Sequence, residues 1–353
     1  MLVKAPELPF WPIVVLLTDK APRHCWHAWR RSGFGGSDAA KILGICPFGT
    51  KRDLYYVKKN IVDASDEESN KWQKHIGNVL EETVALMFSQ VTGYPIFKIE
   101  IMFRSPDYPF MLADVDYFCI LPNGSICILE CKTTSPDNTG KWWHGKKPII
   151  PLNYEAQGQH YMAVMKLNKV FFACLHGNSE DYLIIRELDR DMDCESELIY
   201  LEQDCWYNNV LADVPPPYTE NGELCEESVK RRHGLADPNA APVILTPQTS
   251  LLIPRLTELS ALIKENNAVS KAMENEYKQL KSAITDEMGK SCEATCAIDG
   301  QEYYVTFNPM QKPKILKAQL DILKSLRPEV YQEYVTVAEE RRFHIKPVHN
   351  QAA

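Results

Sequence analysis

Two apolar runs, separated by a Pro-Asn-Gly turn at 122–124, dominate the hydrophobic pattern of residues 110–134. Such a turn between apolar runs predicts a β-hairpin. The second run, 125–133, is apolar at both alternating sets of positions, so we expect a central strand covered on both sides. Glu130 and Lys132 interrupt this run. Because side chains two residues apart share one face of a strand, this carboxylate and ammonium project together from a buried surface.

Helices and strands follow one another through the rest of residues 25–212, which we expect to form one domain behind an N-terminal arm, 1–24. Helical spacing of apolar positions or capping signals predict helices near 22–31, 38–43, 73–91, 151–165 and 194–211. Short apolar runs predict strands at 11–17, 96–103, 169–176 and 182–187. This order is typical of an α/β (α+β) fold, with a central mixed β-sheet flanked by helices.

The C-terminal third differs in pattern. Residues 213–248 are polar and proline-rich, which indicates a linker or insertion. Residues 249–353 read as a mainly helical interaction module, in which 251–289 predicts one long helix or a helical hairpin. A small β-hairpin over 292–307, a helix over 314–326 and a basic end at 341–346 complete this module.

Composition limits the classes of function. The chain has 353 residues and a formal net charge of -8, which argues against indiscriminate coating of nucleic acid but permits a local basic track. Its 11 cysteines are scattered singly, so we expect a reduced, cytoplasmic protein with no zinc site and no iron–sulfur cluster. The apolar run 11–17 is too short to cross a bilayer, and we expect no membrane association.

Carboxylates gather around the predicted hairpin. Asp114 and Asp116 share one face of its first strand, and pairing would bring either of them near Glu130. A buried carboxylate cluster costs several kcal/mol unless a positive charge compensates it, and Mg²⁺ does so with oxygen ligands. Lys132 would then orient or deprotonate a water or stabilise charge on phosphorus. The alternative is an inert buried ion pair between Glu130 and Lys132.

Two polar residues on predicted helices extend this site. Glu81 lies on the flank of the buried face of helix 73–91, where it needs a metal, a metal-bound water or a nearby lysine as a partner. Gln157 lies within an aromatic stripe with Tyr154 and Tyr161, which indicates a specific hydrogen bond.

Two further segments suit nucleic acid. A glycine turn at 33–36 opens a short helix near Ser37, whose backbone N–H groups would suit a phosphate that Arg30 also contacts, although an ordinary capped helix explains the same pattern. Trp142, Trp143 and Lys146 belong to a basic aromatic loop. These side chains would contact the bases at an opened DNA end, or the tryptophans would anchor the loop to the core.

Taken in order, four motifs resemble the YqaJ-type viral recombinase family, relatives of phage lambda exonuclease within the PD-(D/E)xK nucleases. The motifs lie at 30–44, 77–81 with the helix ending at 92–93, 113–116 with 130–132, and 154–161. The resemblance covers about residues 25–210 and implies a restriction-endonuclease-like core.

Carried over residue by residue, the resemblance implies that Asp116 and Glu130 hold divalent metals, Mg²⁺ or Mn²⁺, with Lys132 beside the attacking water. Glu81 would complete the acidic site, and Gln157 would assist near it. Arg30 and Ser37 would hold the 5′-phosphate of a DNA end. Tyr117 follows Asp116, where family members usually have Gly or Arg, so Asp114 remains a rival ligand.

The resemblance also implies an activity: Mg²⁺-dependent, 5′-to-3′ exonucleolytic resection of double-stranded DNA ends for phage or prophage recombination. The implied partners are DNA ends, a single-strand annealing protein and further copies of the chain in a ring, for example a trimer. Two rivals stay open. One is a structure-specific or restriction-like endonuclease on the same fold, and the other is a DNA-binding or recruitment module that does not cleave.

Overall fold

A computed structural model describes residues 1–62, 71–177, 179–234, 239–240, 242–298, 301–309 and 316–336. The chain divides into two units, residues 1–234 and 235–353. Within the described ranges, no helix combines the length and hydropathy of a membrane span.

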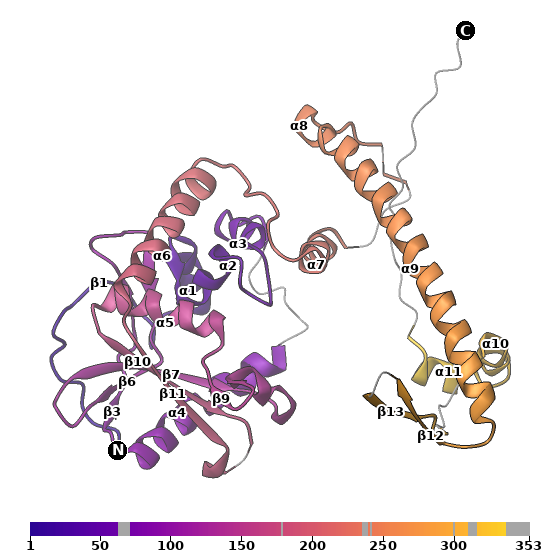
Figure 1. The fold of residues 1–353 in the computed structure, drawn as a ribbon. Coiled ribbons are helices and arrows are strands. Elements are labelled where there is room, and N and C mark those ends of the chain that lie inside the picture. The colour runs from indigo at the N-terminus through magenta and orange to yellow at the C-terminus, as the bar shows by residue number, and fades with distance from the viewer. Residues whose placement is uncertain are drawn as a thin grey trace, which may run out of the picture. The chain divides into compact units, whose positions relative to one another are not determined.

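A five-stranded mixed sheet forms the centre of the first unit (Figure 1). Its strand order is β11-β10-β7-β6-β3, from Leu183–Asp189, Lys169–Leu175, Ile126–Thr133, Tyr117–Ile120 and Ile96–Phe97. β10 runs parallel to β7, and the other pairs are antiparallel. The predicted hairpin is confirmed, with Cys119 opposite Cys127, and its second strand lies at the sheet's centre.

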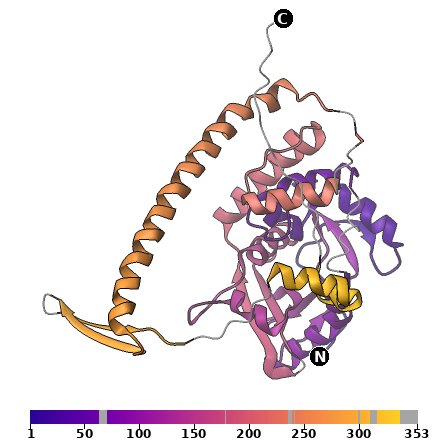
Figure 2. The same cartoon turned by 90° about the vertical axis from the view of Figure 1, so that its right-hand side faces the viewer.

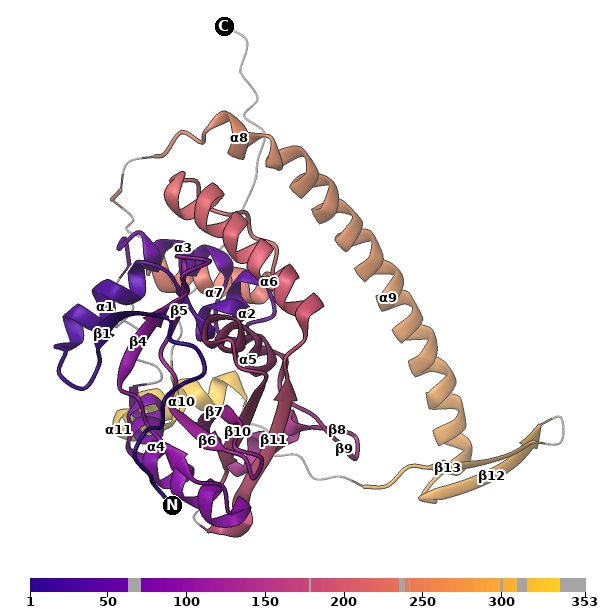
Figure 3. The same ribbon diagram turned by 90° about the vertical axis from the view of Figure 1, so that its left-hand side faces the viewer.

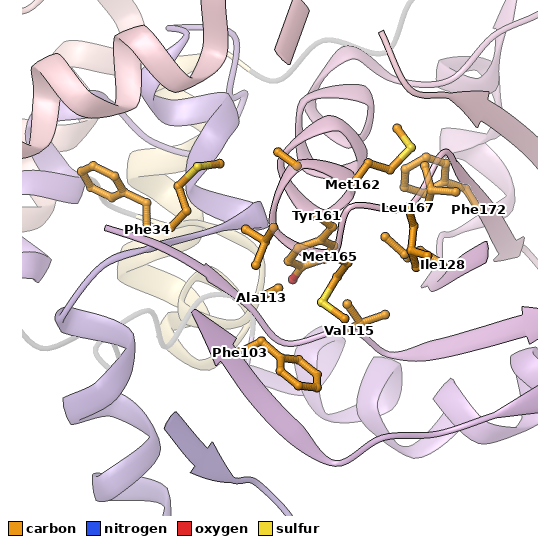
Figure 4. Packing of buried hydrophobic residues seen from close by; sticks show 14 of the residues in the cluster. Phe34, Phe103, Ala113, Val115, Ile128, Tyr161, Met162, Met165, Leu167 and Phe172 are labelled. Atoms are coloured by element: carbon orange, nitrogen blue, oxygen red, sulfur yellow. The ribbon is translucent and has the colours of Figure 1, made fainter. Parts of the chain in front are cut away.

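Alternation along the central strands divides the core into two layers. Ile128 of β7 and Phe172 of β10 pack toward α5 (Leu152–Met165), together with Met162 (Figure 4). Leu129 and Phe171 pack on the opposite face, against α4 (Lys71–Thr92). Figure 3 shows this sheet between the two helices. The predicted central mixed sheet flanked by helices is therefore confirmed.

A second sheet, ordered β1-β4-β5-β2, lies beside the first within this unit. Its strands are Ile13–Leu17, Ile101–Arg104, Met111–Ala113 and Phe34–Gly35. It corrects one expectation, because the single strand predicted at 96–103 is two strands in different sheets. Asp114–Asp116 likewise lie between β5 and β6, where the chain passes from one sheet to the other, and not inside a hairpin strand.

Helices cover the remaining faces of the first unit. These are α1 (Arg23–Arg31), α2 (Gly36–Ile42), α3 (Lys51–Lys58), α6 (Met192–Asp204) and a π-helical continuation, η4 (Cys205–Leu211). Short elements connect them: η2 (Pro136–Trp142), β8 (Trp143–His144), β9 (Lys147–Pro148) and η3 (Glu180–Tyr182).

The first unit extends beyond the boundary expected at residue 212. Helix α7 (Gly222–His233) lies inside the segment predicted as a linker. It packs on the first unit, because Ser228 and Arg231 contact the carboxylate of Asp53 on α3 and Glu220 accepts from the backbone of Lys51. Polar contacts of this kind leave no apolar periodicity in the sequence, which explains why the pattern indicated a linker.

The second unit contains α8 (Pro247–Ser250), α9 (Leu252–Met288) and a hairpin of β12 (Glu293–Ile298) and β13 (Gln301–Thr306). Helices α10 (Lys317–Leu326) and α11 (Pro328–Tyr334) follow. α9 is one uninterrupted helix (Figure 2), so of the two predicted forms the long helix is confirmed. The basic end at 341–346 lies outside the described residues.

Candidate active site

Glu130 and Lys132 lie at the C-terminal end of β7 and share its α5-facing side, as the alternation predicts. Glu130 is 1% exposed. Its Oε2 accepts hydrogen bonds from Nζ of Lys132 at 2.8 Å and from Nε2 of Gln157 on α5 at 2.7 Å. Gln157 therefore makes the specific hydrogen bond that its place in the aromatic stripe indicated.

The second carboxylate oxygen of Glu130 has a different environment. Within the described part of the chain, its Oε1 is buried and has no hydrogen-bond partner. Burial and the nearby Asp116 carboxylate raise the pKa of Glu130 to about 8, and Lys132 only partly offsets them. The same carboxylates raise the pKa of Lys132 against the effect of burial. Lys132 therefore stays charged, and Glu130 lacks enough positive charge to ionise easily.

Asp114 and Asp116 lie in the connection from β5 to β6, and Asp116 lies near Glu130. Oδ2 of Asp116 accepts from the backbone N–H of Cys131 at 2.9 Å, which fixes it beside the end of β7. Oδ2 of Asp114 accepts from Nε1 of Trp26 at 2.8 Å. The negative charge of Asp116 contributes to the raised pKa of both Glu130 and Glu81, so both carboxyl groups lie within electrostatic range of Asp116.

Glu81 enters the site from α4. Burial and Asp116 raise its pKa, although Nζ of Lys98 lies 2.9 Å from its Oε1. Of the partners that the sequence left open, the nearby lysine is thus present. Lys98 lies between β3 and β4, which belong to different sheets, and its side chain reaches Glu81 on α4.

Glu81, Asp114 and Asp116 line a pocket of about 260 Å³, whose lining does not include Glu130 or Lys132. Its walls are formed by Thr18, Asp19, Glu81, Lys98, Glu100, Asp114, Val115 and Asp116. Among the residues that the structure describes, no three Asp, Glu, His or Cys side chains form a ready metal cage. Mg²⁺ does not require one, because it is commonly held by one or two carboxylates, waters and substrate phosphates. The orphaned Oε1 of Glu130 beside Asp116 fits such a cation.

Arg30 and Ser37 come together as predicted, with Nη2 of Arg30 3.2 Å from Oγ of Ser37. The sequence did not reveal their neighbour Asp38. Its Oδ2 lies 3.1 Å from Nη1 of Arg30 and 2.8 Å from Nζ of Lys58, and it accepts from the backbone N–H of Gly35. We call Arg30, Asp38 and Lys58 the Asp38 cluster. It carries two cations and one anion; the Asp114 carboxylate also acts on Arg30, and burial lowers the pKa of Lys58 to about 8.

The basic aromatic loop divides into a buried and an exposed part. Trp142 is 2% exposed and its ring stacks with Tyr154 at 5.6 Å between centroids, so its expected role as a DNA-end contact is wrong and it anchors the loop to the core. Trp143 is 43% exposed beneath the guanidinium of Arg186, and Lys146 is exposed at the adjoining turn. These last two remain candidates for contact with DNA.

Sequence reasoning missed several residues that hold the site in place. Trp26 binds Asp114 from α1, and the hydroxyl of Tyr161 donates to the Asp114 carbonyl at 3.0 Å. Nε2 of His160 lies 2.9 Å from the Leu112 carbonyl, and its Nδ1 lies 2.7 Å from Glu202. The buried polar side chains at 160 and 161 lie in a helix that also carries Asn153, Glu155 and Gln159, so the sequence offered no signal that singled them out.

The fold and site define a class of protein. Residues 25–168 match the family described as the YqaJ-like viral recombinase domain, which confirms the resemblance carried by the four motifs. The chain is 29% identical over 338 residues to the protein YqaJ of Bacillus subtilis (strain 168), covering 95% of this chain and 98% of that protein.

Solved structures similar to the chain include LHK-Exo, an alkaline exonuclease from Laribacter hongkongensis, in complex with dAMP. That comparison has a TM-score of 0.44 and 15% identity over 59% of this chain and 97% of the other. A phage-related exonuclease from Haemophilus somnus 129PT gives a TM-score of 0.35 and 14% identity over 53% and 99%.

Proposed function

We propose that this protein is a metal-dependent 5′-to-3′ exonuclease that resects double-stranded DNA ends for phage or prophage recombination. One observation carries the proposal: the buried Glu130, one of whose oxygens has no partner among the described residues, lies beside Asp116 and Lys132. Such a group costs several kcal/mol in a purely structural role. A hydrolytic site that takes up a divalent cation and a phosphodiester accounts for that cost.

Glu130 and Asp116 would hold Mg²⁺, or Mn²⁺ in its place, with Glu81 completing the acidic side. The bound cation would supply Lewis-acid polarisation of a phosphoryl oxygen. Lys132, whose pKa is raised, acts as a fixed cation and hydrogen-bond donor toward water or phosphate oxygens, which disfavours it as a general base. Gln157 keeps Glu130 oriented through its 2.7 Å hydrogen bond.

We further propose that the Asp38 cluster selects a 5′-phosphate. Arg30 would contact it together with the exposed hydroxyl of Ser37. Arg30→Ala then removes the preference for 5′-phosphorylated over 5′-hydroxyl ends while Asp38 keeps its pairing with Lys58. Equal loss of rate on both kinds of end would contradict this role.

The cellular location, partner protein and assembly that we propose also rest on the resemblance to the family. The protein would act in the cytoplasm of a bacterial or phage-infected host, pass its product to a single-strand annealing protein, and assemble as a ring of identical copies. Exposed Trp143 and Lys146 would contact the DNA end. Since such contacts include phosphate neutralisation, binding weakens as salt rises.

Digestion of linear duplex DNA, labelled at either the 5′ or the 3′ end, with and without Mg²⁺, tests the proposal. We expect release from 5′ ends only, in the presence of Mg²⁺, with closed circular plasmid intact. Cutting of the plasmid would identify an endonuclease on the same fold. Binding without cleavage in Mg²⁺ or Mn²⁺ would identify a recruitment module instead.

A further inference from the structure

Helix α9 exposes an apolar surface along its whole length. It spans 37 residues, or about 55 Å at 1.5 Å per residue, and none of its described residues is buried. A helix in water draws most of its stability from the burial of an apolar face. The exposed face of α9 therefore calls for a partner that covers it.

The exposed apolar residues follow the spacing of a coiled coil. Moving along the helix, the steps alternate between four and three residues, which is a heptad repeat with positions a and d. The a positions are Leu256, Ile263, Ser270, Tyr277 and Ile284, and the d positions are Leu252, Leu259, Asn266, Met273 and Leu280. Every apolar member of this seam is at least 38% exposed.

The residue types along the seam favour two parallel strands. β-branched Ile263 and Ile284 occupy a positions, whereas leucine occupies three of the d positions; this distribution is typical of parallel dimers. Asn266 and Ser270 form the polar middle of the seam. When two copies align in register, each polar residue faces its own equivalent, and a shift of one heptad would set them against apolar residues.

Charge at the flanks of the seam agrees with the same arrangement. In a parallel pair, a g residue lies beside the e residue five positions later on the partner helix. Glu276 occupies a g position and Lys281 the matching e position, so a symmetric pair forms two Glu–Lys contacts. An antiparallel pair joins g to g and e to e and forms neither contact. We propose that α9 forms a parallel two-stranded coiled coil with α9 of a second copy of this chain.

The first test measures the mass of the full chain in solution over a range of concentrations by sedimentation equilibrium. The double variant Leu259→Asp, Leu280→Asp places charges in two d layers and should weaken self-association more than about a hundredfold. The control Ala261→Asp, Ser282→Asp places the same charges on the opposite, f, face and should associate as the unmodified chain does. Circular dichroism verifies that the first unit of both variants remains folded; the double variant in the d layers should lose α9 helicity together with its partner, and the control should not.

The second test measures orientation. Glu276→Lys or Lys281→Glu alone sets like charges together and should weaken association roughly three- to tenfold, whereas the double exchange should restore it. Failure of the double exchange to restore association would overturn the parallel arrangement. An assembly that is unchanged by Leu259→Asp, Leu280→Asp, or a chain that is monomeric throughout, would overturn the proposal.

Discussion

Two buried carboxylates in the first unit, Asp38 and Glu130, differ in how far neighbouring positive charge balances them. Asp38 forms an ion pair with Arg30 and accepts hydrogen bonds from Lys58 and a backbone N–H, all at one oxygen. Burial raises its pKa, but the two cations more than offset this and leave the pKa well below its usual range. Glu130 has one cation, a second carboxylate nearby and an oxygen without a partner in the described residues, and its pKa rises to about 8. Residues of the fold supply the positive charge that balances the Asp38 carboxylate. The positive charge that would balance the Glu130 carboxylate has to come from a bound group.

The largest effect expected from this difference is on catalysis. Glu130→Gln keeps the shape of the side chain but removes the charge that holds a cation, so we expect nuclease activity to fall on the order of a thousandfold or more. Release of labelled nucleotide from duplex ends measures this. Glu187→Gln, an exposed glutamate on β11 of the same sheet, is the matched control and should retain full activity. An active Glu130→Gln enzyme would show that the carboxylate is structural.

The next largest effect concerns Asp38, and it is on folding stability and not on catalysis. Asp38→Asn leaves Arg30 and Lys58 buried without their anion, which should lower the free energy of unfolding by about 3–5 kcal/mol. Urea denaturation measures the loss. The control is Asp107→Asn, which breaks an exposed ion pair with Lys166 and should cost less than about 1 kcal/mol. Equal losses in the two variants would mean that Asp38 is not needed to balance the buried cations.

The site features that the sequence predicted are local in the chain. Glu130 and Lys132 share a face because strands alternate with period two, and the turn at 122–124 determines which strands pair. Asp116 also reaches the end of β7, but from the connection between β5 and β6 and not from the strand position that alternation predicted. The periodicity argument is therefore confirmed for Glu130 and Lys132 and corrected for Asp114 and Asp116.

What the sequence did not predict depends on contacts between distant segments. Trp26 and Asp114 are 88 residues apart, and only the packing of α1 against the sheet-to-sheet connection joins them. Lys58 on α3 and Asp38 on α2 are 20 residues apart, and only the packing of these two helices brings them together. For Trp142 the sequence left both an exposed and an anchored role open, because a tryptophan among lysines suits either. Its stacking on Tyr154, which selects the anchored role, depends on the position of α5.

A moderate effect should appear in the pH dependence of metal binding. The ordinary pKa of Glu130 is 4.5 and the folded value is about 8, so across this interval the folded state binds more protons than the unfolded state. This group's contribution to metal-free stability is therefore present below pH 4.5 and is lost as the pH rises through 8. Mg²⁺ competes with that proton, so its stabilising effect should grow from pH 6.5 to pH 9.

At a concentration one hundred times its dissociation constant, Mg²⁺ should stabilise the chain by about 2.7 kcal/mol. Thermal denaturation at several pH values, with and without Mg²⁺, measures this. Glu130→Gln should remove both the metal-dependent stabilisation and its pH dependence. A variant that kept the same dependence would assign the proton to another group.

The smallest effect concerns Glu202, a third buried carboxylate. We expect neighbouring positive charge to compensate it more than Glu130 and less than Asp38. It is paired one-to-one with His160, both side chains being 0% exposed, and its other oxygen has no partner among the described residues. Burial raises the pKa of Glu202, and His160 only partly offsets this. Burial lowers the pKa of His160 and Glu202 raises it, so removing the carboxylate in Glu202→Gln leaves a neutral imidazole, which the amide still hydrogen-bonds without stranding a charge. Urea denaturation should therefore show a loss of about 1–2 kcal/mol, below that of Asp38→Asn. A loss as large as that of Asp38→Asn would mean that His160 is a buried cation, and that Glu202 is compensated by the fold just as Asp38 is.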